Sequence, residues 1–195
     1  MPRPVSVAIT GGIGAGKSEA LKAFAQYGAA VVSSDEIVHR LLQEDEEVRA
    51  ALRERWGQQV FTNTGDVDRG AVAGIVFRDR TELEWLEALL HPRVVVEYLD
   101  WREQQAARPR PPALTVTEVP LLYEVGGEVR FDKVVAISAE PGLRAARRGA
   151  AVDGRDERLI ADDEKLRRAD FAYVNDGSLA ELEAFVARVV QTLAR

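Results

Sequence analysis

Four glycines, a lysine and a serine follow one another closely near the start of the chain, in the stretch TGGIGAGKS at residues 10–18. Gly11, Gly16, Lys17 and Ser18 match the pattern G-x-x-x-x-G-K-[ST]. Glycines let consecutive main-chain N–H groups turn toward one anion, and the start of a following helix adds a favourable dipole. A lysine at this position reaches the β- and γ-phosphates of a nucleotide, and the serine hydroxyl ligates Mg²⁺. The stretch therefore predicts a loop that binds a triphosphate.

An ordinary glycine-rich turn with an exposed lysine is the alternative interpretation. From average residue usage, the four fixed positions would match by chance in a chain of this length about one time in a hundred. The neighbouring residues also favour the phosphate loop, because VSVAIT at 5–10 predicts a buried strand and SEALKAFAQYG at 18–28 predicts a helix. The motif requires this position between a strand and a helix.

The rest of the chain predicts a parallel sheet with helices around it. AAVVSSD at 29–35 predicts a second strand, which completes a βαβ unit within about 30 residues. The region between Glu36 and Arg108 is mostly helical, and the proline-rich ARPRPPA at 107–113 ends it. Further strands are predicted at 114–119, 133–138 and 171–174. We therefore expect an α/β fold with a five-stranded parallel sheet flanked by helices.

The C-terminal segment predicts a helix that packs on this sheet. Its apolar residues recur at the three- and four-residue spacing of one helix face. They are Leu179, Leu182, Phe185, Val186, Val189, Val190 and Leu193.

Composition restricts the class of protein. The chain has 195 residues, 46% hydrophobic and 30% charged, as expected for one globular domain. It has no cysteine, which excludes disulfides, thiolate metal sites and a cysteine nucleophile. A net charge of -6 argues against general nucleic-acid binding. No segment approaches the roughly 20 apolar residues that span a bilayer, and the N-terminal apolar run is too short for a signal peptide. We expect a cytoplasmic protein without membrane association.

Asp35 is the first candidate for chemistry beyond phosphate binding. It follows the second predicted strand, at the edge where open α/β sheets bind their ligands. A carboxylate there can orient or deprotonate an attacking hydroxyl. The alternative is that Asp35 caps the helix that follows it. A GTPase of the common type is not indicated, because the chain lacks the Asn-Lys-x-Asp sequence that reads guanine.

Five segments extend the phosphate loop into a longer pattern: TGGIGAGKS, SSDEIVHRLL, GDVDRGAVAGIVFRDRTELEWLEALLHPRV, VPLLYEVG and RADFAYVNDGS. In their order and spacing they resemble the dephospho-coenzyme A kinase family over nearly the whole chain. The segments LEALLHPRV and VPLLYE are more specific than the phosphate loop.

The resemblance implies ATP-dependent phosphorylation of the ribose 3′-hydroxyl of dephospho-coenzyme A, giving coenzyme A and ADP. It implies a single P-loop kinase domain with strand order 2-3-1-4-5. The core would cover residues 1–35, 112–140 and 170–195, with a helical substrate-binding insertion at 36–111 and a lid at 141–169. ATP and dephospho-coenzyme A are the implied partners and Mg²⁺ the implied cofactor, and we expect a monomer with at most weak self-association.

The resemblance also assigns residues to the nucleotide. Those that match the family's ATP loop are Gly12, Ile13, Gly14, Ala15, Gly16, Lys17 and Ser18. Asn175 matches a residue that contacts the adenine, although an Asn-Asp-Gly turn would look the same. Arg144 and Arg148, one turn apart, match a pair of lid arginines that close on the ATP phosphates. The glutamine that usually precedes this pair is missing and the alignment slips by one residue.

On the acceptor side, Asp35 matches the family's catalytic carboxylate. Arg69 and His91 match residues that contact the acceptor. A solvated arginine at a helix start and a structural histidine at a break before Pro92 are the alternatives. Glu118, where the family often has Asp, could hold Mg²⁺ through water beside Ser18.

Two other functions are open at this stage. Another small-molecule P-loop kinase, acting on a nucleoside, a nucleotide or a shikimate-like alcohol, would share the loop and Asp35 but not LEALLHPRV or VPLLYE. A regulatory protein that binds ATP without phosphorylating a metabolite would be indifferent to added alcohols.

Overall fold

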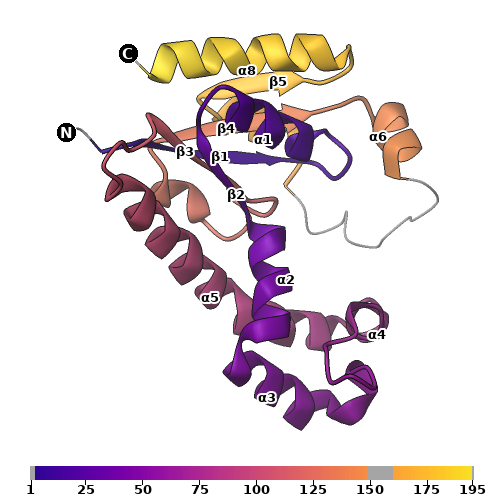
Figure 1. Cartoon of the computed structure of the whole chain (residues 1–195). Helices are drawn as coiled ribbons and strands as arrows, with labels where there is room; N and C mark the ends of the chain where they lie inside the picture. The colour runs from indigo at the N-terminus through magenta and orange to yellow at the C-terminus, as the bar shows by residue number, and fades with distance from the viewer. Residues whose placement is uncertain (1–2, 149–159, 195) are drawn as a thin grey trace. The chain divides into compact units, whose positions relative to one another are not determined.

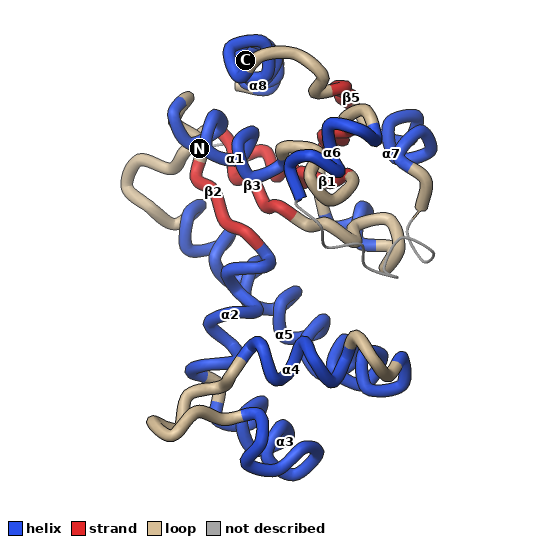
Figure 2. Tube along the Cα trace, turned by 90° about the vertical axis from the view of Figure 1, so that its right-hand side faces the viewer, coloured by secondary structure: helices blue, strands red, loops and turns tan. Residues whose placement is uncertain are grey.

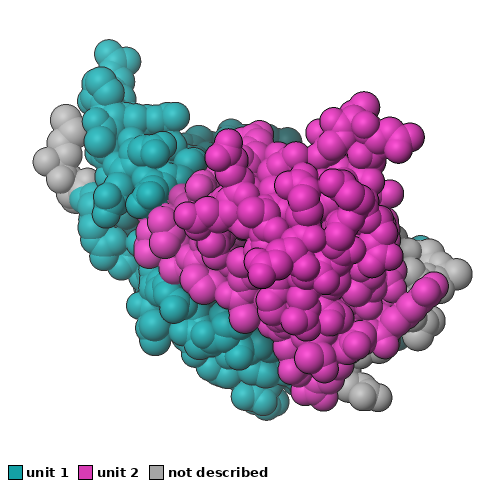
Figure 3. All heavy atoms as spheres, turned by 90° about the horizontal axis from the view of Figure 1, so that it is seen from below, with its two compact units in different colours: residues 1–34, 100–195 teal, residues 35–99 magenta. Residues whose placement is uncertain are grey.

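The computed structural model describes residues 3–148 and 160–194 (Figure 1). It contains two compact units, which Figure 3 shows in different colours. Unit 1 combines Met1–Ser34 with Asp100–Arg195, and unit 2 is Asp35–Leu99. The expected boundaries of the core, the insertion and the lid stay predictions, and residues 149–159 of that lid lie outside the described residues.

Unit 1 is built on the five-stranded sheet that the sequence predicts. The strands are β1 (Val5–Gly11), β2 (Ala30–Ser33), β3 (Leu114–Glu118), β4 (Lys133–Ser138) and β5 (Phe171–Val174). They lie in the order β2-β3-β1-β4-β5, and every neighbouring pair is parallel. The expected fold class and strand order are therefore confirmed. Parallel strands place all their carboxyl ends at one edge, where the phosphate loop begins.

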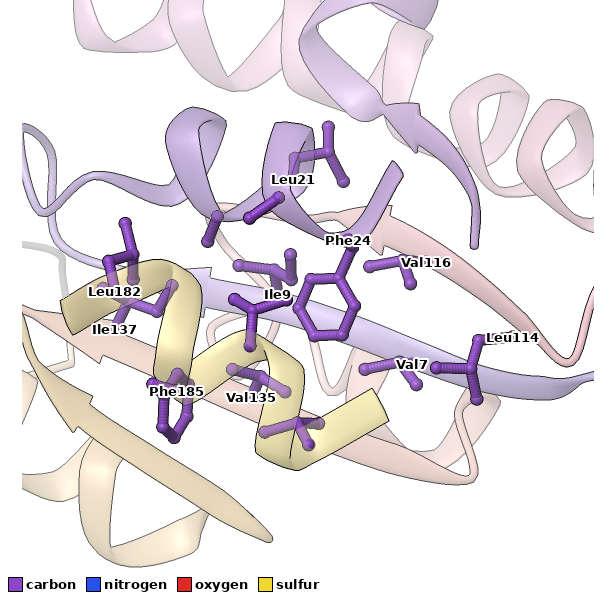
Figure 4. Packing of buried hydrophobic residues seen from close by; sticks show 14 of the residues in the cluster. Val7, Ile9, Leu21, Phe24, Leu114, Val116, Val135, Ile137, Leu182 and Phe185 are labelled. Carbon is purple, nitrogen blue, oxygen red and sulfur yellow. The ribbon is translucent and has the colours of Figure 1, made fainter. Parts of the chain in front are cut away.

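Among the described residues, four helices lie entirely within unit 1. They are α1 (Lys17–Gln26), α6 (Pro141–Arg148), α7 (Asp162–Arg168) and α8 (Leu179–Leu193), with a 3₁₀ turn, η2, at Gly127–Arg130. Figure 4 shows Phe24 of α1 and Phe185 of α8 packed with Ile9 of β1 in one apolar cluster. Ala8, the neighbour of Ile9, belongs to a second cluster with Leu122, because successive strand residues face opposite sides.

The burial of α8 differs from the expectation at its first residue. Six of the seven apolar residues are buried or pack against the core, but Leu179 is 53% exposed. Leu179 begins the helix directly after the capping residue Ser178, whose side chain accepts a hydrogen bond from Glu181 N. The capping geometry fixes where the helix begins, and its first turn is exposed.

Unit 2 is helical, as the sequence predicts between Glu36 and Arg108. Its elements are α2 (Ser34–Glu44), α3 (Glu46–Trp56), η1 (Gly57–Val60), α4 (Arg69–Val76) and the first part of α5 (Arg80–Ala106). Aspartates cap two of these helices: Asp45 accepts from Val48 N at 2.9 Å, and Asp68 accepts from Gly70 N at 2.9 Å. Such caps satisfy N–H groups that have no partner within the helix.

Pro92 lies inside α5, so the break expected at His91 and Pro92 is wrong. Proline has no N–H and therefore costs the helix one main-chain hydrogen bond. The Arg93 guanidinium donates to the Leu89 carbonyl at 2.9 Å, in the same part of the helix. The helix ends at Ala106, before the proline-rich segment, as expected. Of the described helices, none combines the length and apolar character needed to cross a membrane.

Candidate active site

The loop between β1 and α1 has the conformation that its glycines predict. Gly14 and Gly16 have φ angles of 76° and 98°, in the left-handed region that side-chain-bearing residues rarely adopt. A Cβ atom on Gly16 would also overlap the Asn175 side chain. The loop therefore needs glycine at position 16 for two independent reasons. Its main-chain N–H groups lead directly into the N-terminus of α1, an arrangement suited to anions.

Lys17 lies over the start of this loop. Its side chain is buried, and Nζ donates to the carbonyl oxygens of Gly11 and Gly12 at 3.1 and 2.9 Å. Ser18, the next residue of α1, is exposed. The ammonium group of Lys17 and the hydroxyl group of Ser18 thus directly follow the loop glycines, as the motif requires.

Glu118 is a carboxylate at the end of β3, the strand next to β1. It is the last residue of β3, is buried, and is paired in register with Ile9 of β1 and Ser33 of β2. The Glu118 carboxylate and the Ser18 hydroxyl are hard oxygen ligands of the kind that Mg²⁺ prefers. Their chemistry therefore fits a Mg²⁺ ion shared with nucleotide phosphates.

Arg144 also lies against the loop. Its Nη1 donates to Asp162 Oδ2 at 2.8 Å, which joins α6 to α7. Figure 2 shows the backbones of these two helices. A Cβ atom on Gly12 would overlap Arg144 Nη1 and would lie 2.7 Å from Asp162 Oδ2. The guanidinium and the carboxylate both lie against the loop. Of the other expected arginines, Arg148 ends α6 but its side chain is outside the described part of the chain.

Asn175 supports the loop from the end of β5. Its side chain is buried, and Nδ2 donates to the Ala15 carbonyl at 2.9 Å. Its main-chain N–H donates to Ser138 O at 2.7 Å, at the end of β4. The structure therefore places the Asn175 amide against the phosphate loop, and contact with an adenine stays a prediction.

The remaining expected residues belong to unit 2. Asp35 is exposed in the first turn of α2, which begins at Ser34, so Asp35 lies inside the helix and not at the capping position. Arg69 is the exposed first residue of α4, and His91 is half-buried in α5. Each is described within unit 2, whereas the phosphate loop belongs to unit 1.

The sequence does not predict two side-chain contacts of α7. One is Asp162, the partner of Arg144. The other is the buried pair of Lys165 and Glu124, whose Nζ and Oε1 atoms lie 2.6 Å apart. Glu124 Oε1 also accepts from Ile160 N at 3.1 Å. The segment DDEKLRR looks solvated because nearly all its residues are charged, so its sequence gives no signal that Lys165 is buried.

Comparison with known proteins shows which family model and which sequences this chain resembles. A family model described as dephospho-CoA kinase (CoaE) matches residues 5–181. A dephospho-CoA kinase of Chlorobaculum tepidum is 33% identical over 200 residues, covering 97% of this chain and 95% of that protein. One from Protochlamydia amoebophila is 34% identical over 195 residues, covering 96% and 95%.

Solved structures agree on the fold. A crystal structure of a Thermus thermophilus protein matches with a TM-score of 0.75 and 28% identity, covering 98% of this chain and 99% of the other. A dephospho-CoA kinase from Campylobacter jejuni matches with a TM-score of 0.69 and 23% identity, covering 97% and 96%. The five-stranded α/β architecture is thus shared along the whole length of these chains.

Proposed function

The chain belongs to the dephospho-CoA kinase family, and from this premise we propose which of its residues carry out the reaction. It has dephospho-CoA kinase activity, the final step of coenzyme A biosynthesis. We assign the nucleotide to the loop of unit 1, with residues Gly12 to Ser18 around the phosphates of ATP. The observation that carries this assignment is the left-handed glycine loop with the buried ammonium of Lys17 on it.

Positioning and charge neutralisation account for most of the chemistry in phosphoryl transfer. Lys17 would exchange the carbonyl oxygens of Gly11 and Gly12 for the more negative oxygens of the β- and γ-phosphates. Arg144, which already lies against Gly12, would add a second positive charge from the side of α6. Arg148, one turn further along α6, is assigned the same partner by family resemblance alone.

Ser18 and Glu118 would hold Mg²⁺, the serine directly and the glutamate through water. The chemistry that Mg²⁺ supplies in such sites is neutralisation of charge on the β- and γ-phosphates. Asn175 would keep the loop in its binding conformation through Ala15.

The acceptor hydroxyl is assigned to Asp35. It follows Ser33, the last residue of β2, by two residues in the sequence, which matches the position of the family's catalytic carboxylate. Asp35 would orient or accept the proton of the ribose 3′-hydroxyl as it attacks the γ-phosphorus. Arg69 and His91, also of unit 2, would bind the rest of the acceptor. Cytoplasmic location and a monomeric state stay predictions.

Turnover with defined substrates tests the proposal. Purified protein with MgATP and dephospho-coenzyme A should give ADP and the 3′-phosphorylated product in equal amounts, and chelation of Mg²⁺ should stop the reaction. A nucleoside and shikimate serve as competing acceptors, for which we expect no product. A folded sample that phosphorylates one of these acceptors and not dephospho-coenzyme A would contradict the assignment.

A further inference from the structure

Asp162 lies against the phosphate loop and makes side-chain contacts that the proposed function does not use. Its Oδ2 accepts from Arg144 Nη1 at 2.8 Å and from Ser138 Oγ at 2.9 Å. The Asp162 side chain is 17% exposed and that of Arg144 is 27% exposed. Because the contact is largely shielded from water, it restrains the arginine more than a surface ion pair would.

The other end of Arg144 is also fixed to the loop. A Cβ atom on Gly14 would lie 3.0 Å from the Arg144 carbonyl oxygen and 3.5 Å from its Cβ, so the main chain of α6 packs on the loop. Arg144 N donates to the carbonyl oxygen of Glu140, the residue before α6, at 3.0 Å. The residue is therefore held at its backbone by Gly14 and at its guanidinium by Asp162.

After binding Asp162, the Arg144 guanidinium still has N–H groups that can donate to a further acceptor. Arginine has five N–H donors in a rigid fork, and Asp162 binds at Nη1. Among the described residues Arg144 Nε has no hydrogen-bond acceptor, but it is buried, so the donors for a ligand are the N–H groups of Nη1 and Nη2 that Asp162 does not bind. An arginine side chain that moves freely in solution loses rotamer entropy when it is fixed. A side chain that is already fixed has lost much of this freedom before the ligand arrives.

We propose that Asp162 is a positioning residue for ATP: it holds the Arg144 guanidinium against Gly12, with donors ready for phosphate oxygens. This inference rests on the proposed function of the loop as the ATP site. The carboxylate itself repels the polyphosphate, and Arg144 compensates that charge directly across the 2.8 Å contact. The net effect of Asp162 on catalysis with ATP is therefore favourable, and it acts through Arg144.

A double-mutant cycle tests this dependence. We would measure kcat and KM for ATP in the full chain, in Asp162→Ala, in Arg144→Ala and in the double variant. We expect each single substitution to lower kcat/KM for ATP by about tenfold, the size of coupling found within one hydrogen-bonded network. The double variant should be no worse than Arg144→Ala alone. Asp162→Asn, which can still accept one hydrogen bond, should fall between Asp162→Ala and the unmodified chain.

The neighbouring residue provides the matched control. Asp163 is exposed on the same helix, so Asp163→Ala should leave kcat/KM unchanged. Thermal unfolding of every variant separates misfolding from loss of positioning, and Asp162→Asn replaces Asp162→Ala in the cycle if the alanine variant is unfolded.

Contrary results would distinguish a failure of this inference from a failure of the proposed function. Additive losses in the double variant would overturn the inference, because Asp162 would then act independently of Arg144. Tighter ATP binding by Asp162→Ala would also overturn it, because the carboxylate would be a competitor of phosphate. If Arg144→Ala is fully active while the unmodified chain turns over, both this inference and the assigned role of Arg144 are wrong. Absence of turnover in the unmodified, folded chain would instead refute the proposed function itself.

Discussion

The Asn175 side-chain amide donates a 2.9 Å hydrogen bond to the Ala15 carbonyl, so the residue after β5 is joined to the phosphate loop after β1. Asn175→Ala removes the donor. A buried carbonyl that loses its partner costs about 1–3 kcal/mol. Since the Ala15 carbonyl left without its donor belongs to the loop, we expect KM for ATP to rise several-fold with little change in the KM for dephospho-coenzyme A. Steady-state kinetics with each substrate varied in turn would measure this, with the exposed Asn63→Ala as the control. Equal effects on both KM values would contradict it.

Substitution of Asp35 should affect the chemical step. Asp35→Asn keeps the shape of the side chain but removes the base, and general bases contribute about 10²–10⁴-fold to rate. We expect kcat to fall within that range while the affinity for MgATP, measured by calorimetry, is unchanged. The exposed neighbour in the same helical turn provides the control, Glu36→Gln, which should keep kcat near that of the unmodified chain. A near-normal kcat in Asp35→Asn would remove Asp35 from the catalytic role.

The buried Lys165 should contribute far more to stability than an exposed lysine with equally good geometry. Its side chain is 2% exposed and that of Glu124 is 11% exposed, with 2.6 Å between Nζ and Oε1. Lys165→Met leaves a buried carboxylate without its counter-ion, which costs about 3–5 kcal/mol.

Lys22 provides the comparison, since its Nζ lies 2.7 Å from Glu19 Oε1 with both side chains largely exposed. Lys22→Met should cost less than about 1 kcal/mol. Urea unfolding measures both variants, and equal losses would show that burial of the Lys165 pair has no energetic consequence.

Asp132 predicts a dependence of stability on pH. Burial alone raises the pKa of its carboxyl, but hydrogen bonds from the Arg3 guanidinium and from Ser6 N and Oγ outweigh burial and lower the pKa to about 2. A carboxyl with a lowered pKa in the folded state stabilises the fold above its unfolded pKa, near 3.8. That stabilisation is lost as the pH falls from about 4 to about 2.

We therefore expect Asp132→Asn to lower the free energy of unfolding by about 1–2 kcal/mol at pH 7, a value reduced for the partial exposure of the pair. The difference from the unmodified chain should shrink as the pH approaches 2. Urea unfolding between pH 7 and pH 2.5 measures it, with the exposed Asp163→Asn as the control. A difference that stays constant over this range would contradict the assigned hydrogen bonds.

Local sequence was sufficient for the sheet and for the phosphate loop. The strands at Lys133–Ser138 and Phe171–Val174 have the predicted bounds, because strands of a parallel sheet are short apolar runs between polar segments. The loop was identified because its motif fixes residue types that its backbone requires, as the φ angle of Gly16 shows.

What the sequence did not reveal depends on tertiary contacts. Asp162 and Lys165 lie in a charged segment, and only the packing of α7 decides that one meets Arg144 and the other is buried. Leu179 has the spacing of a core residue but lies in the exposed first turn of α8. Pro92 remains inside α5, where Arg93 contacts the Leu89 carbonyl. The spacing of apolar residues predicts which face of a helix is apolar, but it does not predict which residues pack against the helix.

Calorimetric titration with MgATP, of the unmodified chain and of Lys17→Ala, tests most directly whether the loop of unit 1 holds the triphosphate. The exposed Lys22→Ala, on the same helix, is the control for loss of a positive charge. We predict saturable binding to the unmodified chain and to Lys22→Ala, and binding at least about tenfold weaker in Lys17→Ala, since a charge-assisted contact to phosphate is lost. Folded protein that binds no MgATP, or a Lys17→Ala variant that binds it as tightly as the unmodified chain, would contradict the account.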